Sequence, residues 1–180
     1  MKIFTDQMFD FVVAYGGPLS YVIDQRDLAL SECWRVLKPG GLLLFSVMSM
    51  WGSIHRFLDY IMEIPMAVNR MVIHSGDLSP DTFDNEGHHM HMFRAAELRH
   101  WLEDSGWEII ALSASNALST GWEDLLCQVR LDEEKWNALL QVELEACAEE
   151  ASLNMGTHLI AVVKKPANSS MAMRSLPNRS

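Results

Sequence analysis

The stretch that decides the fold begins Phe9-Asp10-Phe11-Val12-Val13-Ala14-Tyr15-Gly16-Gly17-Pro18 and continues to residue 48. Its first seven residues form a short apolar run that is rich in β-branched and aromatic side chains, which is typical of a buried parallel strand. Gly16-Gly17-Pro18 then ends that strand, because glycine and proline favour turns. The run therefore predicts a strand over 9–15 that is followed by a tight loop.

A helix and a second strand follow this loop. Asp24 is the expected N-cap of the helix, and its apolar face is formed by residues at helical spacing: Leu30, Cys33, Trp34 and Leu37. Lys38-Pro39-Gly40-Gly41 is expected to end the helix and turn the chain. The apolar run 42–48 predicts another buried strand. A strand, a helix and a strand with short connections form a βαβ unit, which requires parallel strands and a right-handed crossover.

Alternating elements continue beyond this unit. Residues 51–73 are expected to be mostly helical with a break at Pro65, and the region 51–87 is expected to form a cap whose methionines fill its packing. A loop is expected over 75–87, because turn-prone residues gather there. The remaining expected elements are a helix near 94–105, a strand over 107–115, a helix from Asp132 to about 150, and a last strand over 156–164.

Length and composition limit the classes of function that the chain can have. The 180 residues suit one domain over 1–165, and the tail 166–180 is expected to be disordered. The formal net charge of −10 disfavours binding to nucleic acid or to an anionic membrane. Three widely spaced cysteines indicate buried, reduced thiols, and no apolar run reaches the length of a membrane span. We therefore expect a cytoplasmic protein that binds neither nucleic acid nor membrane.

Several motifs together resemble the class I S-adenosylmethionine-dependent methyltransferases, type 11-like. The Phe9-Asp10 pair that opens the first strand resembles the start of the fourth strand of that family. Arg35-Val36-Leu37-Lys38-Pro39-Gly40-Gly41 is similar to the turn that precedes its fifth strand. The segments 91–107 and 156–164 resemble its sixth strand with the preceding helix and its final antiparallel strand. The resemblance covers roughly residues 8–165, and the turn residues are expected to build the fold rather than to perform chemistry.

The resemblance also predicts what is missing. In this family the first strand ends in a glycine-rich loop that receives the cofactor, and no such loop precedes residue 9. The expected fold is therefore α/β: a partial Rossmann-like open sheet that contains strands four to seven with flanking helices and lacks the first three strands. Without the first strand, residues 9–15 would form an apolar edge, and we expect self-association through it.

Candidate cofactor contacts follow the first strand, because ligands bind at the carboxyl ends of parallel strands. The expected cofactor-binding residues are Tyr15, Gly16, Gly17, Ser20 and Tyr21. The two glycines allow a close backbone approach to a ligand, although a tight turn alone would also require them. The resemblance implies S-adenosylmethionine as the cofactor, with most of its site absent.

Acceptor contacts are expected at the end of the second strand. Ser49 and Trp51 are the candidates for an acceptor pocket, and His55 is the candidate base. The cap would shape the acceptor, for which a small molecule is expected.

A metal site is the alternative for the histidine-rich segment. His88, His89 and His91 lie near Asp84 and Glu86, a ligand set that suits zinc or iron. The cluster lacks a remote ligand, so we expect the chain to hold no metal.

The resemblance implies methyl transfer from S-adenosylmethionine to a small-molecule acceptor, impaired by the missing glycine-rich loop. The alternatives left open are a non-catalytic truncated domain that associates with another chain and a metal-binding protein.

Overall fold

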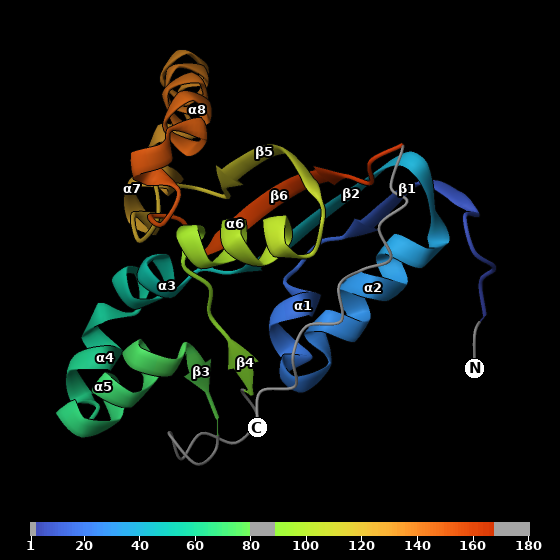
Figure 1. Cartoon of the computed structure of the whole chain (residues 1–180). Helices are drawn as coiled ribbons and strands as arrows, with labels where there is room; N and C mark the ends of the chain where they lie inside the picture. The colour runs from blue at the N-terminus through green and yellow to red at the C-terminus, as the bar shows by residue number, and fades with distance from the viewer. Residues whose placement is uncertain (1–2, 80–88, 168–180) are drawn as a thin grey trace.

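A four-stranded mixed sheet organises the computed structural model, which describes residues 3–79 and 89–167 (Figure 1). Its strands run in the order β1-β2-β6-β5. They are β1 (Phe9–Ala14), β2 (Leu37–Met48), β6 (His158–Lys164) and β5 (Glu108–Ala114). β1 pairs with β2 in parallel, whereas β6 runs antiparallel to both β2 and β5. The predicted parallel pair and the predicted last antiparallel strand are therefore confirmed.

The connection from β1 to β2 is helical, as expected. It consists of α1 (Pro18–Tyr21), the 3₁₀ turn η1 (Ile23–Gln25) and α2 (Arg26–Val36). The expected N-cap was wrong: Gln25 occupies that position, because Asp24 is taken into the 3₁₀ turn. Lys38 to Gly41 lie inside the first part of β2 rather than in a free turn. The reason is backbone pairing, since Gly40 N–H donates to the Lys165 carbonyl and Lys165 N–H donates to the Gly41 carbonyl.

One face of the sheet carries the main core. Helices α2 and α6 (Ala95–Asp104) pack on this face, on which Leu43, Phe45 and Val47 of β2 are completely buried (Figure 1). The helices contribute buried leucines in return: Leu30, Leu98 and Leu102. The helical spacing read from the sequence therefore identified the buried Leu30 of α2, whereas Cys33 and Trp34 of the same predicted face are half-buried.

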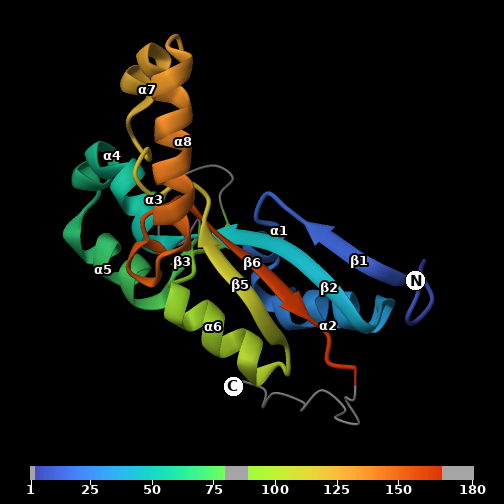
Figure 2. The ribbon, with the colours of Figure 1, turned by 90° about the horizontal axis from the view of Figure 1, so that it is seen from above.

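The opposite face is open over its first strands. No helix of the described chain lies over β1 and β2 on this side, as the view from above shows (Figure 2). Phe11 and Val13 of β1 are 69% and 66% exposed. Among the described strands, β1 pairs on one side alone, with β2. The predicted apolar edge at residues 9–15 is therefore present in the described structure.

A cap follows β2, and we use this name for residues 50–78 together with 89–92. Its helices are α3 (Met50–Arg56), α4 (Leu58–Glu63) and α5 (Met66–Ser75), and its short hairpin consists of β3 (Asp77–Leu78) and β4 (Met90–His91). Pro65 separates α4 from α5 as predicted, because it takes the N-cap position of α5. The cap has its own small core, in which Met50, Met90 and Met92 are buried. The expected use of methionine as packing is confirmed there.

A helical arm completes the described chain. It consists of α7 (Glu123–Val129) and α8 (Glu133–Ala148), followed by the turn η2 (Glu150–Ser152). Helix α8 begins as predicted, since the Asp132 carboxylate caps it by accepting from Lys135 N–H. Helix α7 was not predicted. All three cysteines are free, and Cys127 is exposed, contrary to the expectation of buried thiols.

Two expected segments fall mostly outside the described residues. Most of the expected loop over 75–87 and nearly all of the expected tail lie outside the described residues, although β3 occupies part of the loop region. None of the described helices combines the length and the apolar character that a membrane span requires.

Candidate functional site

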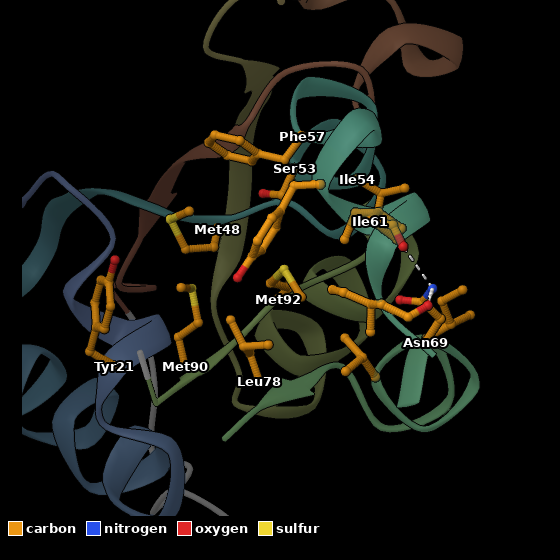
Figure 3. Close-up of a pocket in the computed structure, with 14 residues that line it drawn as sticks. Tyr21, Met48, Ser53, Ile54, Phe57, Ile61, Asn69, Leu78, Met90 and Met92 are labelled. Carbon is orange, nitrogen blue, oxygen red and sulfur yellow. Dashed lines mark hydrogen bonds between the residues drawn. The ribbon is translucent and has the colours of Figure 1, made fainter. Parts of the chain in front are cut away.

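A pocket of about 350 Å³ opens beside the carboxyl ends of β1 and β2, beneath the cap (Figure 3). Tyr21 of α1 and Met48 of β2 form its sheet side. The three cap helices and the β3–β4 hairpin supply the other walls: Ser53, Ile54, Phe57, Tyr60, Ile61, Ile64, Asn69, Val72, Ile73, Leu78, Met90 and Met92. Ligands of open α/β sheets bind at this end of the strands, and the volume suits a small ligand group.

The chemistry of these walls is apolar and uncharged. None of the 14 described residues that line the pocket is an acid or a base. Four of the lining side chains carry a polar group: Tyr21, Ser53, Tyr60 and Asn69. The Asn69 amide donates to the carbonyls of Ile61 and Ile64, so its donors are used by the cap itself (Figure 3). Ser53 is 8% exposed, and its Oγ has no hydrogen-bond partner within the described chain.

The loop after β1 is tied to β2. The backbone N–H groups of Gly16 and Gly17 both donate to the hydroxyl of Ser46, at 2.9 and 3.1 Å. Their φ angles of 91° and 80° lie in the left-handed region, which favours glycine. The turn therefore accounts for both glycines, and a role in cofactor binding stays a prediction.

The other predicted cofactor residues occupy different environments. Ser20 is completely buried, and its hydroxyl accepts from Met48 N–H at 2.8 Å, which joins α1 to the end of β2. Tyr15 and Tyr21 are 60% and 46% exposed, and Tyr21 lines the pocket. Only Tyr21 of the five predicted residues is thus part of the pocket wall, and the cofactor role of all five stays a prediction.

The predicted acceptor residues lie next to the pocket but do not line it. Ser49 is completely buried as the N-cap of α3, where its hydroxyl accepts from Gly52 N–H. The Trp51 ring packs under the Arg94 guanidinium, 5.6 Å from its centre. His55 is exposed on α3. Their roles in catalysis or acceptor binding stay predictions. Ser53, one turn along the same helix from Ser49, lines the pocket and was not predicted to do so.

A buried histidine fastens the cap hairpin to the sheet domain. His91 is 4% exposed, and its two ring nitrogens lie 2.7 Å from Asp77 Oδ1 and 2.7 Å from Glu97 Oε1. Burial acts to raise the pKa of Glu97, but the hydrogen bond and charge of His91 outweigh it, so this pKa lies below its usual value of 4.5. Glu97 also accepts from Arg94 N–H at the start of α6. The cluster therefore links β3, β4 and α6.

The metal alternative finds no support in the described residues. His88, Asp84 and Glu86 lie outside them. Both nitrogens of His91 are engaged by carboxylates, and His89 is exposed. Within residues 3–79 and 89–167, no group of three potential ligands is arranged to hold a metal ion.

A methyl-donor cofactor would find few partners among the described residues. At the carboxyl end of β1 both loop N–H groups are already bound to Ser46, and Ser20 is bound to Met48. The hydroxyl-bearing rings of Tyr15 and Tyr21 are the exposed groups that remain there. The described residues therefore do not by themselves fit the whole cofactor.

Comparison with known proteins finds similarity to methyltransferases. Residues 1–45 match the family model described as a methyltransferase domain. The tRNA 5-carboxymethoxyuridine methyltransferase of Escherichia coli K12 is 25% identical over 161 residues, which cover 86% of this chain and 54% of that protein. The protein of the same description from Escherichia coli O157:H7 is 24% identical with the same coverage. The chain spans about half the length of these curated relatives.

Solved structures give the same fold. A S-adenosylmethionine-dependent methyltransferase from Methanosarcina mazei aligns with a TM-score of 0.55 at 19% identity, covering 92% of this chain and 63% of that one. A methyltransferase of the same cofactor class from Mesorhizobium loti aligns with a TM-score of 0.52 at 16% identity, covering 89% and 63%. The described structure is therefore an α/β methyltransferase fold with a mixed sheet.

The expected partners need correction. A small-molecule acceptor and no nucleic acid were expected, but the curated relatives are tRNA methyltransferases. The expectation treated the net negative charge as evenly distributed over the protein surface. Residues 121–150 hold nine acidic against two basic side chains, so this segment carries −7 of the total −10. Helix α8 in this arm points away from the β3–β4 side of the pocket (Figure 1). The described cap residues hold three acidic and two basic side chains, so the cap itself is close to neutral.

Proposed function

We propose that this chain, a member of the class I S-adenosylmethionine-dependent methyltransferases, forms the acceptor-binding part of an enzyme that methylates a nucleoside in RNA. The observation that carries the proposal is the uncharged pocket beneath the cap, at the carboxyl ends of the parallel strands. The relatives described as tRNA methyltransferases supply the acceptor class.

The pocket chemistry supports a base as the bound group. Enzymes that modify a base within a nucleic acid take it out of the stack and hold it between aromatic and apolar side chains. Phe57, Tyr60 and Tyr21 provide aromatic rings around this pocket, and three methionine side chains provide adaptable contacts (Figure 3). Such walls stabilise an unstacked base without requiring a charged partner.

The distribution of charge supports an RNA backbone near the cap. Arg70 lies on α5 beside Asn69, is exposed and makes no ion pair within the described chain. The acidic arm carries most of the negative charge on the other side of α3. A phosphate backbone that approaches from α5 therefore meets a cation and avoids most of the carboxylates.

The methyl donor is S-adenosylmethionine in this proposal, and when bound it supplies an electrophilic methyl group. We propose that the described strands correspond to strands four to seven of the family sheet. The strand order β1-β2-β6-β5 with antiparallel β6 supports this correspondence. In that arrangement the chain's own residues bind and orient the acceptor and exclude water from it. The cytoplasmic location expected from the sequence stays part of the proposal.

Fluorescence anisotropy tests the acceptor class. The purified 180-residue chain is titrated into labelled bulk tRNA at 50 mM salt and competed with unlabelled tRNA or duplex DNA of equal mass. We expect a dissociation constant on the order of micromolar, and competition by tRNA at least tenfold better than by DNA. Equal competition by both, or the absence of binding, would contradict the proposal.

A calorimetric titration with S-adenosylhomocysteine tests whether this chain binds the acceptor but not the cofactor. Because the described residues supply few donors for the cofactor, we expect no saturable heat below about 100 μM, which corresponds to roughly 5–6 kcal/mol of binding free energy. Micromolar binding of this compound by the chain alone would contradict the assignment of the chain to acceptor binding.

A further inference from the structure

We infer that the pocket beneath the cap selects an uncharged planar base and rejects a base that bears a carboxylate, unlike the 5-carboxymethoxyuridine that the description of the curated relatives names, and that the Ser53 hydroxyl is its hydrogen-bond partner. This inference rests on the proposed function, because it specifies the group that the acceptor site accepts. It concerns the described walls of the pocket, residues 21–78 and 90–92.

Ser53 carries the argument for a ligand. Its backbone is already satisfied: its N–H donates to the Ser49 carbonyl, and its carbonyl accepts from Phe57 N–H. Its hydroxyl is the remaining polar group, and it is buried without a partner in the described chain. Figure 3 places Ser53 on the α3 wall between Phe57 and Met48. A buried hydroxyl without a partner is unfavourable, so a carbonyl or imino group of a bound base would correct the deficit.

The rest of the wall explains the rejection of charge. A carboxylate that enters an apolar site loses its water and needs a cation or several donors in return. The Asn69 amide donors are engaged by two cap carbonyls. The walls otherwise present aliphatic, thioether and aromatic groups and the hydroxyls of Tyr21 and Tyr60, and none of these groups carries a positive charge. A neutral ring gains contact with these groups and loses little hydration.

Nearby cations are also engaged elsewhere. The Arg94 guanidinium donates to the Ile73 carbonyl and lies over Trp51. Arg56 pairs with Glu123 at 2.8 Å. The His91 ring is held between Asp77 and Glu97. None of these three side chains lines the pocket, so a bound carboxylate could pair with one of them only by breaking an existing interaction.

The experiment uses methyl NMR of the full chain labelled with ¹³C at the methionine methyl groups. The probes are two nucleosides that differ in charge: neutral 5-methoxyuridine and anionic 5-carboxymethoxyuridine, each titrated at pH 7.5. Met48, Met90 and Met92 report on the pocket, and the exposed Met62 and Met66 serve as controls. With the neutral nucleoside we expect saturable chemical shift changes at the methyl groups of the three pocket methionines. The anionic nucleoside should bind at least tenfold more weakly.

A matched pair of variants tests the role of Ser53. Ser53→Ala removes the hydroxyl that has no partner, so we expect an unchanged or higher melting temperature and at least fivefold weaker binding of 5-methoxyuridine. Ser31→Ala is the control, because the Ser31 hydroxyl on α2 donates only to the Leu28 carbonyl, away from the pocket. We expect this control to bind like the unmodified chain.

The possible outcomes separate the two proposals. Equal or tighter binding of the anionic nucleoside, or unchanged binding in Ser53→Ala, overturns this inference even if the chain binds tRNA. Shifts confined to Met62 and Met66 do the same. Conversely, selective binding of the neutral nucleoside in the pocket, without binding of tRNA, supports the selectivity of the pocket and contradicts the proposed RNA acceptor.

Discussion

Replacing His91 by Gln should destabilise the whole domain, although the residue lies outside the pocket. His91 makes two contacts of 2.7 Å to carboxylates and is almost fully buried. A hydrogen bond to a charged group contributes about 1.5–3 kcal/mol. The side chains of Asp77 and Glu97 are 39% and 34% exposed, so water recovers part of that loss. Gln can replace one of the two bonds, and we therefore expect a loss of about 2 kcal/mol.

Urea unfolding followed by circular dichroism measures this change, and His100→Gln is the matched control. His100 pairs with Asp104 at 3.1 Å but is 77% exposed, so its replacement should change the free energy of unfolding by less than about 0.5 kcal/mol. Thermal melting gives a second reading, with about 5 °C expected for His91→Gln in a chain of this length. If the two variants show the same stability, His91 does not fasten the hairpin to α6.

The same variant has a defined pH dependence. The pKa of Glu97 is depressed in the folded state, so its contribution to stability is present above the unfolded value and is lost as pH falls through the folded value. His91→Gln removes the hydrogen bond and the charge that lower the pKa of Glu97. The stability difference between the unmodified chain and the variant should therefore be largest near neutral pH and should shrink below pH 4.5, the usual value for this group. A difference that grows on acidification would refute this explanation.

Two further substitutions test the packing and the charge of the cap. Gly52→Ala should lower the free energy of unfolding by about 3 kcal/mol in urea titrations, because an added Cβ would lie 1.7 Å from the Gly156 carbonyl oxygen; a loss below 1 kcal/mol would show that the two segments separate easily. Arg70→Ala should weaken tRNA binding and reduce the slope of log affinity against log salt by about 1, as expected for one phosphate contact. Arg130→Ala, an exposed arginine in the acidic arm, should leave that slope unchanged, and equal effects of the two would argue against a backbone path along α5.

The sequence predicted the sheet domain well, because its signals are local. The leucine spacing of the first helix reports burial directly, and the structure buries Leu30 there. The run at 9–15 predicted the strand correctly, but its predicted burial was wrong, because β1 is an edge strand on which Phe11 and Val13 are exposed. The turn Lys38–Gly41 resembles the corresponding methyltransferase turn but continues as strand, because its pairing partner, Lys165, lies more than a hundred residues away in the chain. Pairing at that distance leaves no local signal.

The pocket was harder to predict for the same reason. Its walls come from α1, β2, three cap helices and a hairpin, and the apolar residues among them resemble ordinary core residues in the sequence. Ser53 gives no signal until its helix is packed and its hydroxyl is found without a partner. His91 was considered as a metal ligand, whereas the fold engages both its nitrogens with Asp77 and Glu97, 14 and 6 residues distant.

Photo-crosslinking tests most directly whether the pocket beneath the cap receives an RNA base. The full chain is mixed with tRNA transcribed with 4-thiouridine, irradiated and digested, and the crosslinked peptides are identified by mass spectrometry. We expect crosslinks within residues 53–61 and 90–92, which form opposite walls of the pocket (Figure 3), and we expect their loss when excess unlabelled tRNA competes. Crosslinks confined to the α7–α8 arm or to the open face at Phe11 and Val13 would contradict it.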